Sequence, residues 1–189
     1  MAGSWVTRWR VRAGYPLAVL YFVLATPTLR ATGVGAVISA IGLVIRGAAA
    51  GHLRKLESLT TTGPYALTRN PLYLGSAFLA AGFAVAGASI WSALVLAAYF
   101  FAFYPAVMKK EEAELRARYG PVFDEYAKRV PLFFPATRRH GNSSSMPNGG
   151  AQFSWEQYWR NREYQAAIGT LGALALVWLR MLARKRLGW

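Results

Sequence analysis

Residues 63–75 read GPYALTRNPLYLG and place polar groups between two rigid turns, directly ahead of a long apolar run. Pro71 suits the first position of a helix, and Asn70 suits its N-cap. Such a helix start presents unpaired N–H groups and a positive dipole to an anionic group. The stretch therefore either only caps a helix or positions polar groups for chemistry at a membrane surface.

A second polar segment, residues 109–135, holds five of the eight acidic residues of the chain. Glu111 and Glu112 come within four residues of an apolar run that ends at Met108, which places the pair at a membrane surface. Acidic groups are disfavoured there unless they have a partner or a function. A solvated pair beside Lys109 and Lys110 is the alternative interpretation.

Composition indicates a membrane protein and excludes several kinds of site. The 189 residues are 54% hydrophobic and 14% aromatic, with a net charge of +14. The basic residues lie between apolar runs, as in cytoplasmic membrane loops, so we expect contact with anionic lipid headgroups and not with nucleic acid. With no cysteine and two distant histidines, we expect no metal site.

Long uncharged runs predict an all-α integral membrane bundle of about five transmembrane helices. The 38 residues from 71 to 108 carry no charge. One helix of that length would measure ~57 Å, against a hydrocarbon core of ~30 Å. The run must therefore fold back, and residues 86–89 (AGAS) form the natural turn.

Three parts of the chain follow from these runs. The membrane core is expected over residues 1–136, a flexible Gly- and Ser-rich linker over 137–153, and a C-terminal helical appendage over 154–189. The expected spans are about 13–29, 33–51, 71–87 and 89–108, with a candidate fifth span at 164–182.

The basic residues also predict the orientation. They favour a cytoplasmic N-terminus and cytoplasmic segments at 51–70 and 109–163, in a bacterial or archaeal inner membrane. The first helix is expected to be retained and not cleaved as a signal peptide. Because basic residues flank both ends of 164–182, that helix is expected to span, to tilt or to lie along the interface.

Two further patterns concern packing. Beyond Gly120, a short helix is predicted from Pro121 to a stop at Pro131, with Val122, Tyr126 and Val130 on an apolar face that rests on the membrane. In the third span, small side chains at positions 82 and 86 are expected to permit close helix packing.

The two polar segments together resemble the isoprenylcysteine carboxyl methyltransferase and phospholipid methyltransferase superfamily. The resemblance covers about residues 57–135, and order and spacing both agree. The motifs that carry it are Gly63-Pro64-Tyr65, Arg69-Asn70-Pro71-Leu72-Tyr73-Leu74-Gly75, Glu111-Glu112, Tyr119-Gly120-Pro121-Val122-Phe123 and Arg129-Val130-Pro131.

The resemblance implies an S-adenosylmethionine (SAM)-dependent membrane enzyme. A cytoplasmic pocket formed by the connecting loops would hold the cofactor, and a lipid-like acceptor would enter from the bilayer. Glu111 would accept hydrogen bonds from ribose or the ammonium group, and tyrosine rings would line the adenine or the sulfonium. The implied cofactor contacts are Leu59, Thr60, Tyr65, Asn70, Pro71, Leu72, Tyr73 and Glu111. The implied catalytic residues are Arg46 and Glu112.

Two positions depart from the family pattern. Asn70 replaces the usual histidine before the proline, and Val107 replaces an arginine that holds a substrate carboxylate in isoprenylcysteine enzymes. The acceptor thus stays open between a prenylcysteine-type carboxylate and a phospholipid amine. Arg46 either snorkels to the membrane surface or meets an anionic substrate group.

Two other functions are also compatible with the sequence. One is an NADPH-dependent membrane reductase of the sterol-reductase kind, whose C-terminal half looks similar. The other is a non-catalytic membrane protein that keeps the fold without the activity, which the change at Asn70 would suit.

Overall fold

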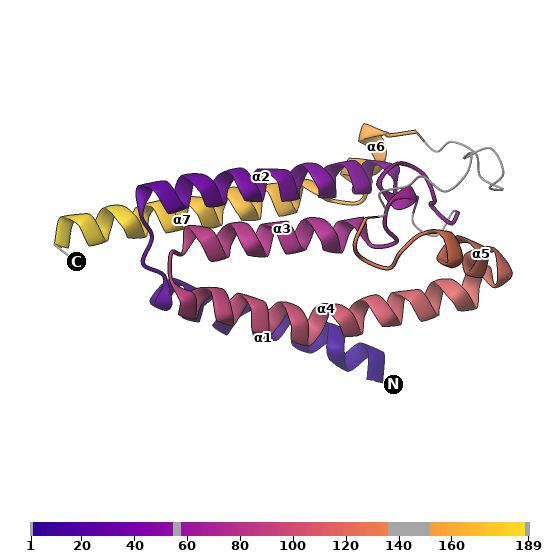
Figure 1. The fold of residues 1–189 in the computed structure, drawn as a ribbon, viewed down its shortest axis with the longest axis horizontal. Coiled ribbons are helices and arrows are strands. Elements are labelled where there is room, and N and C mark those ends of the chain that lie inside the picture. Colours follow the sequence, from indigo (N-terminus) through magenta and orange to yellow (C-terminus); the bar gives the residue numbers. More distant parts are fainter. Residues whose placement is uncertain (1, 55–57, 136–151, 188–189) are drawn as a thin grey trace. The chain divides into compact units, whose positions relative to one another are not determined.

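The computed structural model describes residues 2–54, 58–135 and 152–187, and within these ranges the chain is helical with no strand (Figure 1). The elements are α1 (Ala2–Leu24), α2 (Leu29–His52), the 3-10 helix η1 (Gly63–Ala66), α3 (Pro71–Ala86), α4 (Ile90–Tyr119), α5 (Pro121–Arg129), α6 (Trp155–Arg160) and α7 (Tyr164–Leu187). The predicted all-α class is confirmed. Most of the predicted linker, 137–151, lies outside the described residues.

Long-range contacts divide the chain into two compact units. Unit 1 comprises residues 1–42, 77–107 and 167–189, and unit 2 comprises residues 43–76 and 108–166. Helices α2, α3, α4 and α7 contribute residues to both.

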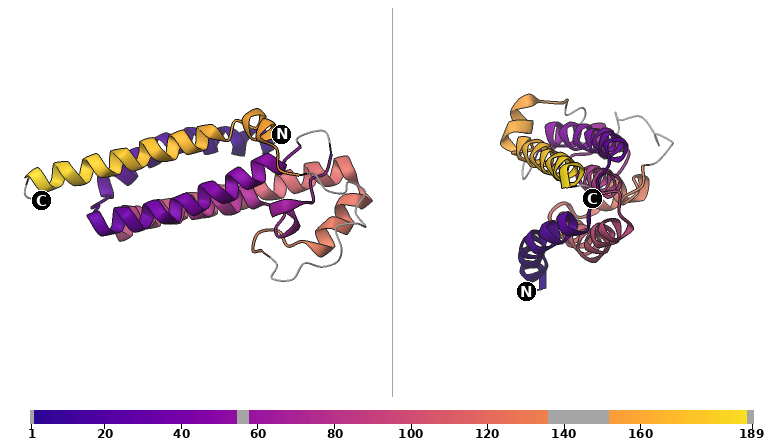
Figure 2. Two further views of the ribbon diagram at one scale, coloured as in Figure 1. Left: turned by 90° about the horizontal axis from the view of Figure 1, so that it is seen from above. Right: turned by 90° about the vertical axis from the view of Figure 1, so that its left-hand side faces the viewer.

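Unit 1 consists of apolar helices packed side by side (Figure 2). Its core contains Tyr21 and Ala25 of α1, Ala86 of α3 and Val177 of α7. The Tyr21 hydroxyl donates to the Phe83 carbonyl at 2.7 Å. The buried Tyr21 hydroxyl thus finds its partner on the backbone of a neighbouring helix.

Helices α2 and α3 approach closely because small residues face one another. A Cβ atom on Gly82 would collide with Ser39 Oγ and come within 2.6 Å of the Gly35 carbonyl oxygen. A Cβ on Gly35 would collide with the Gly82 carbonyl in turn. The predicted close packing at Gly82 and Ala86 is confirmed, and it follows the small-residue rule of membrane helix pairs.

At one end of unit 1, hydrogen bonds join α7 to the end of α1. Helix α1 ends at Leu24, earlier than the charge pattern alone predicts, because Pro27 lacks an N–H group and disfavours helix in the residue before it. Arg180 of α7 donates to the carbonyls of Val23 and Ala25, which the helix end leaves unpaired. The predicted fold-back at 86–89 is confirmed, since α3 ends at Ala86 and α4 begins at Ile90.

Three helices in the described ranges are long and apolar enough to cross a membrane. They are Leu29–His52, Ile90–Tyr119 and Tyr164–Arg186. Two further apolar segments, Arg12–Leu24 and Pro71–Ala86, are shorter. Three candidate spans are thus found in the described ranges, and the expected count of five is not confirmed. Exposed apolar side chains along these helices suit contact with lipid.

Unit 2 has its own core, built around α5. Phe123, Tyr126 and Val130 are buried against Leu59, with Leu115 of α4 packed beside them. Figure 1 shows α5 turned back beside the last turns of α4. This fold-back begins at Gly120, which adopts a left-handed φ of 51°.

The predicted bounds of the short helix are confirmed, and Tyr126 and Val130 of its predicted apolar face are buried, but Val122 is not. Val122 is 46% exposed, whereas Phe123 is 1% exposed. The apolar face of α5 packs on Leu59 and α4. The prediction was wrong for Val122 only, because residues three and four positions before Tyr126 can both share its helix face, and contact with Leu59 selects Phe123.

Candidate active site

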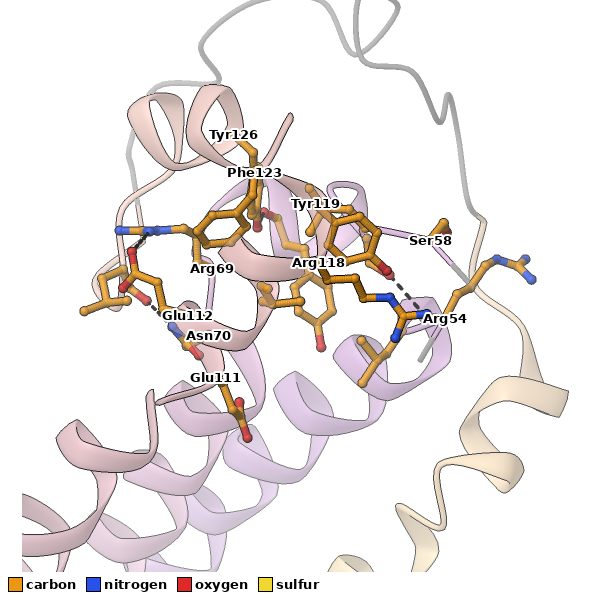
Figure 3. A pocket seen from close by; sticks show the side chains of 16 residues that line it. Arg54, Ser58, Arg69, Asn70, Glu111, Glu112, Arg118, Tyr119, Phe123 and Tyr126 are labelled. Atoms are coloured by element: carbon orange, nitrogen blue, oxygen red, sulfur yellow. Dashed lines mark hydrogen bonds and ion pairs between the residues drawn. The ribbon is translucent and has the colours of Figure 1, made fainter. Parts of the chain in front are cut away.

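Unit 2 contains a cavity of about 340 Å³ (Figure 3). It is lined from the loop after α2, from the start of α3, from the end of α4 and from α5. Of the sequence-predicted residues, the cavity is lined by Leu59, Thr60, Tyr65, Asn70, Glu111 and Glu112. Segments more than 40 positions apart in the chain therefore supply one shared wall.

The first polar segment turns sharply at Gly63. This residue has a left-handed φ of 60°, and a Cβ there would lie 2.5 Å from the His52 ring. Only glycine satisfies both conditions without strain. Pro64 follows in the first turn of the 3-10 helix, which leaves Tyr65 buried in the cavity wall. The Tyr126 hydroxyl donates to the Tyr65 carbonyl at 2.7 Å and joins this turn to α5.

Asn70 occupies the N-cap position of α3. Its carbonyl accepts the first helical bond from the Leu74 N–H, and Pro71 follows at the first helical position. Its side-chain amide donates to the Leu132 carbonyl at 2.9 Å, and the Arg69 N–H donates to the Pro131 carbonyl at 2.9 Å. Pro131 and Leu132 thus hold the start of α3 in place, each from 62 positions later in the chain.

The two acidic residues have different partners. Glu111 accepts a hydrogen bond from the Tyr73 hydroxyl at 2.5 Å. Glu112 pairs with Arg69 at 2.6 Å and with Arg116 at 3.5 Å. Because α4 and the start of α3 are linked through both carboxylates, the pair is not merely solvated beside the preceding lysines. Glu111 and Glu112 thus each have a specific partner in the chain, which contradicts the interpretation as a solvated pair.

The electrostatics of the wall follow from burial. Burial, followed by the nearby Tyr126 hydroxyl and the Glu111 and Glu163 carboxylates, raises the pKa of Tyr65 well above its usual value. Burial also raises the pKa of Tyr126, against a smaller lowering effect from Arg69. Both hydroxyls therefore stay protonated at neutral pH and can donate hydrogen bonds.

Four predicted residues do not line the cavity. Pro71 is fully buried at the start of α3, and Tyr73 contacts the cavity through Glu111. The Leu72 carbonyl accepts from Arg46 Nη1 at 3.3 Å. Arg46 itself forms a two-pronged ion pair with Glu163, at 2.5 Å from Nε and 3.0 Å from Nη2. The Arg46 guanidinium is thus paired with a carboxylate of the chain itself.

Other cavity residues were not assigned a role from the sequence. They include Arg54, Arg69, Arg118, Tyr119, Phe123 and Tyr126. Arg69 and Phe123 belong to the motifs quoted above, so the motif pattern already contained that signal. Arg54 and Arg118 lie in segments with many basic residues, where spacing gives no indication of which side chain faces inward.

Comparison with known proteins places the chain in a family. A family model described as phospholipid methyltransferase matches residues 9–122. Over 82 residues the chain is 44% identical to the nickel-cobalt-cadmium resistance protein NccN of Alcaligenes xylosoxydans xylosoxydans, a match that covers 43% of this chain and 38% of NccN. Over 140 residues it is 35% identical to the cobalt-zinc-cadmium resistance protein CzcN of Cupriavidus metallidurans, covering 67% of this chain and 62% of CzcN.

The chain thus spans less than two thirds of the length of either relative. No solved structure matches it. The family model covers more than half of the chain and includes both polar segments up to α5. Together with the long apolar helices, this match shows that the chain is an integral membrane member of the phospholipid methyltransferase family.

Proposed function

We propose that this protein transfers a methyl group from SAM to a lipid-like acceptor and that the cavity of unit 2 binds SAM. One observation carries the proposal. Tyr65, Asn70 and Glu111, implied as cofactor contacts by the family resemblance, line the same cavity although they come from two distant polar segments.

The cavity chemistry fits the groups that SAM presents. The Glu111 carboxylate suits the ammonium group and the ribose hydroxyls, and aromatic rings at Tyr119 and Phe123 suit adenine. The Nε atom of Arg69 is buried and has no hydrogen-bond partner in the described part of the chain. A buried unpaired donor is costly, and a ligand oxygen would relieve that cost.

When bound, SAM supplies a methyl group on a positively charged sulfur. The residues of this chain need only orient the two reactants and exclude water, which is worth up to ~7–11 kcal/mol for well-aligned reactants. For a neutral amine, the N–C bond forms as the S–C bond breaks, and the amine proton leaves to a carboxylate. We assign that proton transfer to Glu112, whose side chain lines the cavity.

The acceptor is proposed to be a lipid-like amine or carboxylate that reaches unit 2 from the bilayer. Val107 is buried and supplies no cation for a carboxylate at the position where isoprenylcysteine enzymes carry one. We further propose an inner-membrane location in a bacterium or archaeon, with the N-terminus and the cavity facing the cytoplasm, from the distribution of basic residues.

Calorimetry of the purified protein with SAM and with NADPH tests the cofactor. We expect SAM to bind and NADPH not to bind. Glu111→Gln removes a charged hydrogen-bond acceptor, worth about 1.5–3 kcal/mol, and should weaken SAM binding by roughly 10- to 100-fold. Glu114→Gln, an exposed carboxylate on the same helix, is the matched control. NADPH binding would indicate a reductase, and binding of neither ligand would indicate a protein that keeps only the fold.

Transfer of a labelled methyl group into a total lipid extract tests the acceptor. Label recovered in a lipid amine, or in a base-labile methyl ester, identifies an amine or a carboxylate acceptor respectively. No labelled lipid under conditions where SAM binds would contradict a lipid-like acceptor.

The names of the two relatives suggest a physiological setting. Both are named as resistance proteins for cobalt and cadmium, each with one further metal. We propose that methyl transfer by this chain also contributes to metal resistance. Growth of a host expressing the wild type or Glu111→Gln on cobalt or cadmium tests this, and equal growth would contradict it.

A further inference from the structure

The Arg46–Glu163 ion pair lies directly behind the cavity wall. Arg46 Nη1 donates to the Ser76 hydroxyl at 2.6 Å and to the Leu72 carbonyl at 3.3 Å, both on α3. Tyr73, next to Leu72, bonds to the cavity residue Glu111. The pair is therefore one layer away from the proposed binding site.

Glu163 is held in place by its own turn. The Asn161 amide donates to the carbonyls of Ala50 and Leu53 at 2.8 and 2.9 Å, which attaches the turn to the end of α2. Arg162 adopts a left-handed φ of 54°, a strained state that persists only where the surroundings impose it. The Glu163 side chain is 9% exposed. The hydrogen-bonded turn therefore holds the Glu163 carboxylate in a fixed position beside Arg46.

All three guanidinium nitrogens of Arg46 already have partners. Nε and Nη2 bond to the two carboxylate oxygens of Glu163, and Nη1 bonds to α3. Glu163 also lies outside residues 9–122, which the family model matches. The anion at Arg46 therefore comes from the chain itself and from a region beyond the matched family segment.

Charge gives this pair a role in ligand selection. SAM carries a positive sulfur, whereas S-adenosylhomocysteine (SAH) lacks the transferred methyl group and the charge but is otherwise the same molecule. An unpaired guanidinium near the cavity would repel the positive sulfur, because charges interact strongly where solvent is partly excluded. The Glu163 carboxylate also acts on the Tyr65 hydroxyl in the cavity wall.

We propose that Glu163 is a specificity-determining residue, which neutralises Arg46 so that the cavity accepts a positively charged methyl donor. The inference rests on the proposed SAM binding. It assigns no direct ligand contact to Arg46 or Glu163. Their effect is electrostatic, and it should therefore appear as a change in the preference for SAM over SAH.

Calorimetry with SAM and with SAH on four full-length proteins tests this role. The proteins are the wild type, Glu163→Gln, the double variant Arg46→Met/Glu163→Gln, and Glu156→Gln as an exposed carboxylate control in α6. We expect Glu163→Gln to weaken SAM binding about fivefold relative to SAH, which is the repulsion expected between two unit charges roughly 17 Å apart at an effective dielectric near ~20. The double variant should regain the wild-type ratio, and the control should keep it.

The outcomes separate the two proposals. If the wild type binds SAM but Glu163→Gln leaves the ratio of the SAM and SAH dissociation constants unchanged, the role of Glu163 is refuted while the proposed function stands. If the wild type binds no SAM, the proposed function fails and this inference fails with it. Should Glu163→Gln not fold, the double variant decides alone, and a ratio different from wild type overturns the charge argument.

Discussion

Different kinds of contact stabilise the interior of unit 1 and the interior of unit 2. In unit 1, Gly35 and Gly82 let two helix backbones touch, and most polar contacts lie at the helix ends. In unit 2, ion pairs and hydrogen bonds such as Arg69–Glu112 and Asn70–Leu132 join segments far apart in sequence. Shape therefore determines packing in the apolar unit, while polar pairing determines it around the cavity. This difference predicts which substitutions each unit tolerates.

The largest effect is expected for Gly82→Leu in unit 1. Its Cβ would collide with Ser39 and approach the Gly35 carbonyl, and a backbone cannot yield as a side-chain end can. Overpacking costs ~1–3 kcal/mol or more, so we expect loss of folded protein in detergent. Size-exclusion yield and melting temperature measure this. Gly169→Leu, where a Cβ meets nothing within 4 Å, is the control. Equal yields for the two variants would contradict shape-controlled packing.

Next in size is Arg69→Met in unit 2. Its side chain is 14% exposed, and the change leaves Glu112 without its closest partner. Removing one member of a mostly buried pair should cost about 2 kcal/mol, somewhat less than for a fully buried pair. Melting temperature checks this. Arg129→Met is the control. It removes an exposed ion pair with Glu125 at 3.9 Å, and the variant should have a melting temperature near that of the wild type.

A smaller effect is expected for Tyr126→Phe, which removes the hydroxyl bond to the Tyr65 carbonyl. The loss should be about 1 kcal/mol at pH 7, typical of one hydrogen bond. The variant also tests a pH effect. Both tyrosines have a raised pKa when folded, so their contribution is complete below pH 10.0 and is lost as the pH rises above it.

Melting temperatures from pH 8 to pH 11 measure that dependence. The wild type should lose stability above pH 10, and Tyr126→Phe should lose less over the same interval. An identical slope for both proteins would show that the Tyr126 hydroxyl does not contribute.

The smallest effect is expected for Lys128→Gln on the outer face of α5. Lys128 pairs with Glu125 at 2.7 Å, and this pair lowers the pKa of the Glu125 carboxyl, but both side chains are exposed. Exposed pairs contribute little and are screened by salt. Melting temperature should change by less than about 2 °C, and a larger change would mean that surface pairs matter in unit 2 as much as Arg69 does.

Much of the fold could be predicted because it depends on local sequence. Uncharged runs, the turn at 86–89 and the stop at Gly120 and Pro121 all act within a few residues. The membership in the family was likewise readable from ordered motifs. The buried face of α5 was not, because Phe123 and Val122 are both apolar and only contact with Leu59 selects between them.

By itself, the sequence determined an all-helical membrane chain and the two polar segments that carry the family motifs. The tertiary structure alone decided which groups meet. Arg46 pairs with Glu163 across 117 positions, and Tyr126 bonds to the Tyr65 carbonyl across 61 positions. Helix formation follows from side-chain chemistry along a few turns, whereas pairing over such distances depends on how folded segments pack. For this reason the sequence left Arg46 open between the membrane surface and a substrate anion and gave no indication that Glu163 pairs with it.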